Sequence, residues 1–263
     1  MSVVNRRIAI VGSGNVATHI TVALSTKGYE IAGVFSRSID NARALTRRCG
    51  LPDNKASDDF GSLPSAGADT VIVSLADGCV REVLSKIPRL ENTVVLHTSG
   101  TLPMEVLSCL TSSYGIIYPL QTFSKNVDVD MSTVPFFTEG ADVPTLAVAD
   151  SIASSLSDTV AHADARKRHA LHIAGVLSCN FPNYLWECVE KILAAEGYDL
   201  HVVEPLVRAT VDKAFSVGPH AAQTGPARRG DRAVIADHRA SLPADLSDVY
   251  ASLSEMIMKS HGK

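Results

Sequence analysis

The sequence predicts a doubly wound α/β domain with a mostly parallel sheet, followed by an all-helical domain. Two observations support this prediction. Over the first half of the chain, short apolar runs alternate with segments of helical apolar spacing, which is typical of a parallel sheet with crossover helices. After about residue 150 the spacing is helical almost throughout. We therefore expect two domains, residues 1–151 and residues 152–263.

Apolar runs rich in β-branched residues mark the expected strands. These strands are residues 7–11, 31–35, 70–75, 93–96, 115–118, 134–138 and 159–162. Helical apolar spacing, bounded by glycine, proline or capping residues, marks the helices between them. These helices are residues 15–27, 41–49, 79–87, 103–110 and 143–155.

The second half carries four further helical patterns. They cover residues 164–195, 200–216, 231–240 and 244–259. Pro182 lies inside the longest of them. Because proline lacks an N–H group and its ring crowds the preceding turn, we expect a kink or break there.

Composition narrows the class of protein. The 263 residues are 46% hydrophobic and carry a net charge of −4. Such a chain is globular, and its acidic balance disfavours nucleic-acid and membrane-surface partners, which require a basic face. No apolar stretch approaches the roughly 18 residues of a membrane span, and we recognise no secretory signal.

Cysteine and histidine spacing points to a cytoplasmic protein without a metal site. The five cysteines form no C-x-x-C pair, and we interpret them as reduced, mostly buried thiols. The nine histidines show none of the spacings that bind a metal ion.

The segment GSGNVA, residues 12–17, predicts a dinucleotide-binding turn. Gly12 permits a tight turn, Gly14 lets a pyrophosphate approach the backbone, and Ala17 allows the helix to pack on the strand. The pyrophosphate would meet the N–H groups at the helix N-terminus. The expected cofactor contacts are Gly12, Ser13, Gly14, Asn15 and Val16. The alternative is a strand that meets a helix without a ligand.

The end of the second strand favours NADP over NAD. An NAD site requires Asp or Glu there to bind the ribose 2′-hydroxyl, whereas this sequence has Ser36, Arg37 and Ser38. An arginine between two hydroxyls suits a 2′-phosphate. The alternative for Arg37 is a solvated surface side chain.

Two later strand ends complete the expected cofactor site. In open α/β sheets ligands bind at the carboxyl ends of the strands, and small or hydroxyl residues there leave room for ribose and nicotinamide. The expected contacts are Leu75, Ala76, Asp77, Thr98 and Ser99. Ser99 is equally suited to cap the next helix, and we interpret His97 as structural.

Three segments carry groups that could act on a substrate. In YPLQTFSK, we expect Tyr118 and Gln121 to form a substrate floor and Lys125 to contact an anion. The alternative is an ordered interdomain loop.

On the long helical segment, His172, Asn180 and either Asn183 or Tyr184 share one face. A polar stripe on an otherwise apolar helix needs partners, which a ligand or a helix–helix contact could supply. His169, three residues before His172, is a further candidate, but beside Arg166 and Arg168 it fits a solvated face better.

The segment AQTGPARRGD presents Thr224, Arg228 and Arg229 on a loop shaped by glycine and proline. Such a loop could close over an anionic substrate in its own or a partner subunit, and Asp231 can cap the following helix. The alternative is a connector between helices.

Six segments together carry a family resemblance: GSGNVATHI, VFSRS, HTSG, YPLQTFSK, LHIAGVLSCNFPNYLW and AQTGPARRGD. In this order they resemble a bacterial family of Rossmann-like proteins of uncharacterised function, often named NADP oxidoreductases, with a helical C-terminal domain. That family is similar in plan to pyrroline-5-carboxylate reductase, ketopantoate reductase, deazaflavin-dependent NADP reductase and the β-hydroxyacid dehydrogenases. The resemblance implies a homodimer through the helical domain and an active site between the domains.

The sequence departs from part of that plan. Ketopantoate reductase and the β-hydroxyacid dehydrogenases have a catalytic lysine on the long helix, and the resemblance places His172 there, followed by Asn180. Histidine can protonate a carbonyl oxygen or an imine nitrogen. Pyrroline-5-carboxylate reductase lacks the lysine, so an imine substrate stays open.

The resulting hypothesis is an NADP(H)-dependent oxidoreductase. It transfers hydride between nicotinamide and a small carboxylate-bearing ketone or imine, with His172, Asn180 and Gln121 as catalytic residues. One alternative is a non-catalytic NADP-binding redox sensor, and another is an enzyme with a deazaflavin or flavin as hydride partner.

Overall fold

The computed structural model describes residues 6–263 and divides the chain into two compact units, Met1–Cys179 and Asn180–Lys263. The predicted boundary at 151/152 falls inside helix α4, Val143–Leu156, which packs on the sheet. Strand β8, Val160–His162, also pairs with the sheet. The division therefore lies later in the chain than the sequence indicated.

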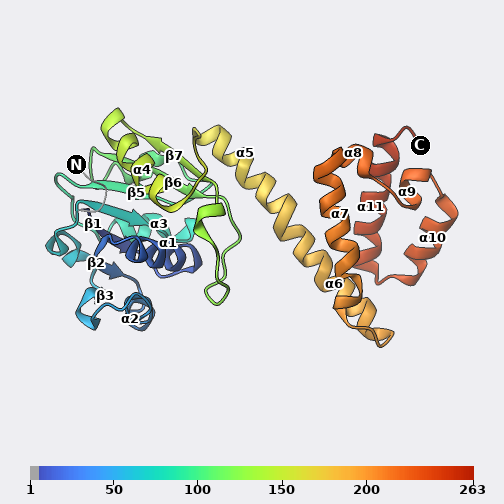
Figure 1. Ribbon diagram of the computed structural model, residues 1–263, viewed down its shortest axis with the longest axis horizontal. Helices are drawn as coiled ribbons and strands as arrows, with labels where there is room; N and C mark the ends of the chain where they lie inside the picture. Colours follow the sequence, from blue (N-terminus) through green and yellow to red (C-terminus); the bar gives the residue numbers. More distant parts are fainter. Residues whose placement is uncertain (1–5) are drawn as a thin grey trace. The chain divides into compact units, whose positions relative to one another are not determined.

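The first unit is built on one eight-stranded sheet of order β3-β2-β1-β4-β5-β6-β7-β8 (Figure 1). Its strands are β1 Arg7–Val11, β2 Glu30–Phe35, β3 Ala56–Ser57, β4 Thr70–Val73, β5 Val94–His97, β6 Tyr114–Pro119, β7 Phe136–Gly140 and β8. All neighbouring pairs are parallel except β6 and β7, which confirms the mostly parallel prediction. Strand β3 was not predicted, because two residues show no periodicity.

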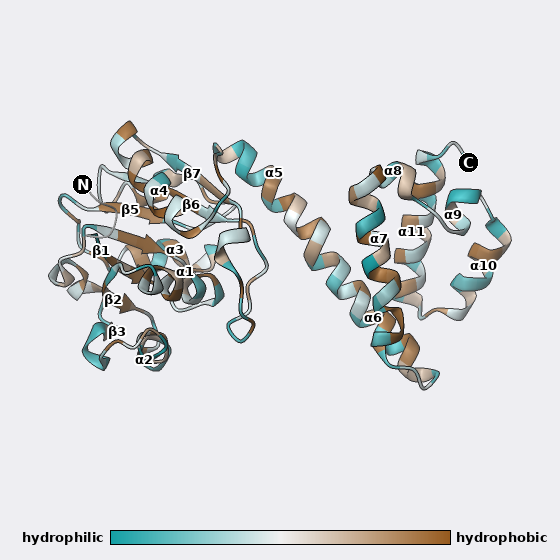
Figure 2. Cartoon of the chain, in the orientation of Figure 1, coloured by the Kyte–Doolittle hydropathy of each residue, from teal (hydrophilic) through white to brown (hydrophobic). Residues whose placement is uncertain are grey.

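Helices cover both faces of this sheet. The helices of the unit are α1 Asn15–Thr26, α2 Ile39–Arg48, α3 Asp77–Leu84, α4 and α5 Ala165–Gly175. Residues of α1, α2 and α4 form one apolar core with one sheet face, and residues of α3 form a second core with the other face. The strands β1, β2 and β5 are strongly apolar (Figure 2), as expected for strands buried on both sides. The helix expected at 103–110 is only a 3₁₀ turn, Met104–Leu107.

The second unit is helical, as predicted. It contains α6 Phe181–Ala195, α7 Glu204–Val217, α8 Pro219–Ala222, α9 Pro226–Arg229, α10 Arg232–Ser241 and α11 Ala244–Ser260. The expected break near Pro182 is a π-helical turn, Val176–Asn180, after which Pro182 lies in the first turn of α6. The chain stays helical through this turn, because Asn180 has φ −68° and ψ −45°, and a π-turn is one of the ways in which a helix accommodates a proline.

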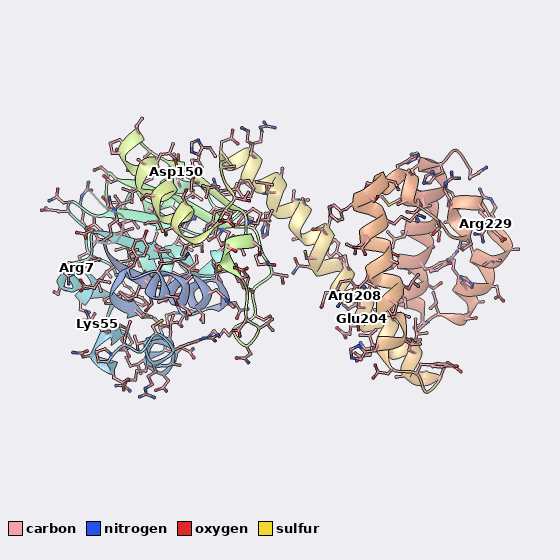
Figure 3. All side chains as sticks on the ribbon, viewed as in Figure 1. Arg7, Lys55, Asp150, Glu204, Arg208 and Arg229 are labelled. Carbon is pink, nitrogen blue, oxygen red and sulfur yellow. The ribbon has the colours of Figure 1, made fainter. Side chains whose placement is uncertain are left out.

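Surface ion pairs occur in both units (Figure 3). Arg7 on β1 pairs with Glu30 on β2 at 3.2 Å, and Glu204 pairs with Arg208 one turn later on α7 at 2.7 Å. Such exposed pairs add little stability.

Three further features concern the sequence-based expectations. All five cysteines are free, and none is fully buried, so the expectation of mostly buried thiols was wrong. No helix between residues 6 and 263 is long and apolar enough to cross a membrane. Over the same residues, no group of three or more histidine, cysteine or acidic side chains could hold a metal ion.

Candidate functional site

The carboxyl ends of β1, β4, β5 and β6 lie along one edge of the sheet, because these strands are parallel. The glycine turn follows β1, and the segments with Asp77 and Ser99 follow β4 and β5. Tyr118 lies at the end of β6. The edge therefore collects most of the predicted cofactor residues of the first unit.

Gly12 fits its position because no other residue would. Its φ angle is +124°, and a Cβ atom would lie 2.0 Å from the carbonyl oxygen of Ser74 at the end of β4. Its N–H donates to the carbonyl oxygen of Phe35 at 2.7 Å. The turn is thereby fixed between the ends of β4 and β2.

Gly14 has the opposite surroundings. A Cβ atom there would have nothing within 4 Å, and no side chain caps the α1 N-terminus that Gly14 precedes. The N–H groups in the first turn of a helix have no acceptors within it and can bind an anion. The open space beside Gly14 thus fits the close approach of a pyrophosphate. Among the predicted neighbours, Val16 is half-buried and Asn15 is exposed.

The end of β2 meets the glycine turn through two hydroxyl groups. The Oγ atoms of Ser13 and Ser36 are 2.7 Å apart. Ser38 caps α2 by accepting the N–H of Asn41 at 3.3 Å. Arg37 is exposed, in keeping with either a 2′-phosphate contact or a solvated side chain.

The segments after β4 and β5 are bonded to each other. Thr98 donates its hydroxyl to the Ser74 hydroxyl at 3.1 Å, and Asp77 accepts the hydroxyl of Thr101. Ala76 is exposed at the start of α3, and a Cβ atom on Gly12 would lie 3.4 Å from Leu75 Cδ2. These bonds fix the segments after β4 and β5 beside the glycine turn.

Ser99 and His97 serve the loop after β5. The Ser99 hydroxyl accepts the N–H groups of Thr101 at 3.1 Å and Leu102 at 3.0 Å. This is a capping role for its own loop. The buried His97 ring bonds to the carbonyl oxygen of Pro103 and the N–H of Ser99, and burial lowers its pKa to about 4. The interpretation of His97 as structural is confirmed.

Tyr118 and His172 form the pair best suited to proton transfer. The Tyr118 hydroxyl lies 3.4 Å from His172 Nδ1, and the two ring centres are 6.5 Å apart. Burial raises the pKa of Tyr118, so its hydroxyl keeps its proton at neutral pH. Both rings lie over the buried Gly100, where a Cβ atom would be 2.9 Å from His172 Nδ1.

The loop that follows Tyr118 is fastened to α1. Asn15 donates an amide N–H to the carbonyl oxygen of Phe123 at 2.8 Å. The Nε2 atom of His19 lies 3.0 Å from the carbonyl oxygen of Ser124. His19 also stacks on Phe123, with ring centres 4.9 Å apart. This loop therefore lies directly beside the glycine turn.

The polar side chains predicted on this loop lie at the surface. Gln121 is exposed and accepts the N–H of Thr122 at 2.8 Å. Lys125 is half-buried, and its carbonyl oxygen accepts a guanidinium N–H of Arg48. Both retain groups that a substrate could bind.

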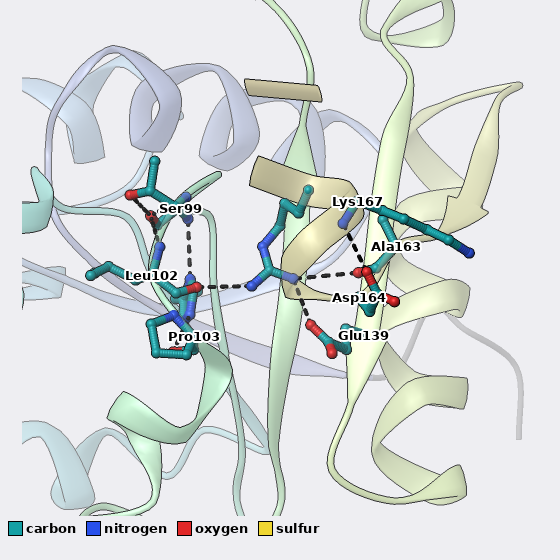
Figure 4. A network of polar contacts seen from close by, with 10 residues as sticks. Ser99, Leu102, Pro103, Glu139, Ala163, Asp164 and Lys167 are labelled. Carbon is teal, nitrogen blue, oxygen red and sulfur yellow. Dashed lines mark hydrogen bonds and ion pairs between the residues drawn. The ribbon is translucent and has the colours of Figure 1, made fainter. Parts of the chain in front are cut away.

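Arg168 was wrongly assigned to a solvated face. Arg166 and His169 are exposed, but Arg168 is 0% exposed. Its guanidinium donates to Glu139 at 2.5 Å, to the carbonyl oxygen of Leu102 at 2.8 Å and to that of Ala163 at 3.3 Å (Figure 4). A buried arginine is tolerated only with such partners.

The remaining predicted residues belong to the second unit. Asn180 and Asn183 are exposed at the start of α6, and the unit boundary separates them from His172. Arg228 and Arg229 are exposed on α9, and Thr224 is exposed just before it. Asp231 caps α10 as expected, by accepting the N–H of Val234.

Comparison with solved structures identifies the family. A Bacteroides fragilis protein, titled a "putative NADP oxidoreductase", is 33% identical, with 98% of this chain and 100% of that one aligned and a TM-score of 0.88. The chain belongs to the same family. The alignment with this member of the NADP oxidoreductase family extends over both units of the chain.

Two family models match this chain, and the second begins within the first unit, at residue 134. Residues 7–99 match the model described as "NADP oxidoreductase coenzyme F420-dependent". Residues 134–257 match a domain of unknown function, DUF2520. A search of curated proteins finds no match.

More distant structures share the fold of the oxidoreductase. A reductive aminase from Aspergillus terreus, solved with NADPH and ethyl-5-oxohexanoate, is 15% identical, with a TM-score of 0.68 over 97% of this chain and 94% of that one. The 1-pyrroline-5-carboxylate reductase of Streptococcus pyogenes is 15% identical, with a TM-score of 0.66 over 97% and 99%. At this identity the likeness concerns the fold alone.

Three residues that contact these segments were not predicted from the sequence: His19, Gly100 and Arg168. His19 could have been found, because it follows Asn15 by four residues and shares its helix face. Gly100 and Arg168 gave no local signal, since their partners lie far away in the sequence.

Proposed function

We propose that this protein is an NADPH-dependent reductase that transfers hydride from nicotinamide to a small carboxylate-bearing ketone or imine. The observation that carries the proposal is the Tyr118–His172 pair, which lies at the sheet edge that also carries the glycine turn. A hydride acceptor must gain a proton as well, and a tyrosine–histidine pair can deliver one.

NADP binding to this edge follows from the shape of the turn. The pyrophosphate would bind the backbone from Gly12 to Val16, where Gly14 leaves open space. The 2′-phosphate would bind Ser36, Arg37 and Ser38, because no carboxylate there repels it. When bound, NADPH supplies the hydride.

His172 is the proposed proton donor. Tyr118 is protonated at neutral pH, so its hydroxyl can donate a hydrogen bond to His172 Nδ1. A neutral His172 ring that accepts this bond at Nδ1 carries its own proton at Nε2. The proton can then pass from the ring to a carbonyl oxygen or an imine nitrogen. Gln121, exposed three residues after Tyr118, would orient the substrate.

Substrate binding is assigned to exposed groups that suit a carboxylate. In the first unit this group is Lys125, beside Gln121. In the second unit the proposed contacts are Asn180, Asn183, Thr224, Arg228 and Arg229. Their support is their exposure and their capacity to donate hydrogen bonds to an anion.

We further propose a homodimer through the helical unit. The buried apolar cluster of this unit contains only Ala227, Ile235 and Met258. Large apolar side chains are instead exposed on α6 and α7, including Phe181, Tyr184, Leu206, Val211 and Phe215. A unit of this size with so small a core requires further burial, and a second copy presents an identical apolar face.

The decisive experiment compares His172→Ala with His169→Ala. Both residues lie on α5, but His169 is exposed and lacks the tyrosine partner. NADPH consumption is followed with a panel of small keto acids and cyclic imines, and NADPH affinity is measured by calorimetry. We expect His172→Ala to lose roughly 10²- to 10⁴-fold in kcat with its NADPH affinity retained, and His169→Ala to match wild type.

Other results would overturn the proposal. Unchanged turnover of His172→Ala refutes the assignment of the proton donor. Tight NADPH binding without consumption of any panel member instead supports the non-catalytic redox sensor. A flavin-like absorbance spectrum of the purified protein would indicate the third alternative, a deazaflavin or flavin partner.

A further inference from the structure

Gly100 is the point where the loop after β5 meets the proposed proton-transfer pair. It is buried, and a Cβ atom on it would lie 2.9 Å from His172 Nδ1 and 3.0 Å from Tyr118 Cζ. Real Cβ atoms essentially never lie closer than 3.0 Å to such atoms, and contacts up to 3.4 Å already force a neighbour to give way. Any side chain on Gly100 therefore requires the rings or the loop to move, so the loop lies in close contact with both rings.

The loop is itself held by Arg168. Two residues after Gly100, the carbonyl oxygen of Leu102 accepts a guanidinium N–H of Arg168 at 2.8 Å. The N–H of Leu102 is bonded to the Ser99 hydroxyl, so the segment from 99 to 102 is closed on itself. A shift of Leu102 would therefore move Gly100 as well.

Arg168 fixes its own helix through the same guanidinium. It bonds to Glu139 on β7 and to the carbonyl oxygen of Ala163, which precedes α5. His172 follows Arg168 by four residues, one turn later on the same face of α5. One fully buried side chain thus bonds the helix that carries His172 to the loop that carries Gly100 (Figure 4).

We infer that Arg168 is a positioning residue for the reaction. It holds the loop after β5 against the start of α5, so that Gly100 seats the His172 ring at its distance from the Tyr118 hydroxyl. The inference rests on the proposed function of His172. This role requires arginine. The planar guanidinium donates to three acceptors at once, on Glu139, Ala163 and Leu102, and the single ammonium group of a lysine cannot reach all three.

The test measures kcat, KM and NADPH affinity in Arg168→Lys and Gly100→Ala. Gly100→Ala leaves the Arg168 contacts in place, so it still tests the inference if Arg168→Lys fails to fold. The matched controls are Arg166→Lys, an exposed arginine on the same helix, and Gly175→Ala, where a Cβ atom would make an ordinary 3.4 Å contact with Leu120.

We expect both test variants to lose roughly 10- to 100-fold in kcat while NADPH affinity stays close to wild type. Both controls should retain wild-type kcat. In addition, Gly100→Ala combined with His172→Ala should be no slower than His172→Ala alone, because the two changes remove the same proton delivery.

Each failure has its own signature. If His172→Ala turns over normally, the proposed function fails. If His172→Ala is impaired but Arg168→Lys folds and turns over at the wild-type rate, the positioning role of Arg168 fails. Wild-type turnover of Gly100→Ala likewise shows that Gly100 does not place the His172 ring, which overturns the inference. A double variant much slower than His172→Ala, together with a loss of NADPH affinity in the single variants, shows that Gly100 and Arg168 serve general structure, which also overturns the inference.

Discussion

The two glycines of the turn should respond to the same substitution in different ways. Gly12→Ala should lower both the stability of the protein and its affinity for NADPH. Gly14→Ala should lower NADPH affinity, with a much smaller loss of stability. The difference follows from what a methyl group would meet at each position.

The magnitude at Gly12 has two parts. A φ angle of +124° strains any residue with a Cβ atom, at a cost of about 1–3 kcal/mol. The methyl group would also lie 2.0 Å from the Ser74 carbonyl oxygen, so the turn must move by roughly 1 Å away from β4, at a further cost of about 1–3 kcal/mol. A loss of about 2 kcal/mol or more corresponds to a fall in Tm of at least about 4 °C in a unit of this size.

At Gly14 the folded protein has room for the methyl group. A Cβ atom meets nothing within 4 Å, and alanine in place of glycine before a helix costs no more than about 1 kcal/mol. The same methyl group occupies the space proposed for the pyrophosphate. Loss of one charged hydrogen bond weakens NADPH binding roughly 10- to 100-fold.

Thermal unfolding without nucleotide and calorimetric titration with NADPH measure the two effects separately. Gly175→Ala serves as the control: its NADPH affinity should match wild type and its Tm should not fall, because alanine is favoured over glycine in a helix. Wild-type NADPH affinity in Gly14→Ala would refute the placement of the pyrophosphate. A Gly12→Ala protein as stable as wild type would refute the reasoning from the φ angle and the contact with Ser74.

Three further predictions concern other parts of the molecule. Arg37→Ala should remove a preference for NADPH over NADH of roughly 10- to 100-fold, and equal affinities in wild type would refute the role of Arg37. Because burial lowers the His97 pKa from 6.5 to about 4, the unfolded state binds more protons between these values, so stability should fall as pH falls from 6.5 to 4. Chemical denaturation across this range should show that fall, with a flatter dependence in His97→Gln, and an unchanged profile would contradict it. Phe215→Glu should shift the protein from dimer to monomer in sedimentation, since this side chain is 90% exposed, whereas unchanged sedimentation would place the interface elsewhere.

The position of the glycine turn could be predicted because its signals are local. Gly12, Gly14 and Ala17 lie within six residues, between an apolar run and a helical pattern. The structure places the turn after β1, as that pattern requires. Strand and helix positions were predictable for the same reason, since periodicity is a property of neighbouring residues.

The contacts around His172 and Arg168 could not be predicted with the same precision, because they join residues that are distant in sequence. Tyr118 and His172 are separated by 54 residues, and Arg168 and Leu102 by 66. A basic cluster such as RKRH gives no local indication of which member is buried, because burial depends on whether the fold supplies acceptors. Here Glu139 on β7 and the carbonyl oxygen of Leu102 after β5 reach one side chain only. Arg168 therefore becomes part of the interior while Arg166, two residues earlier, stays exposed, and this difference is what makes the two arginines a matched pair for experiment.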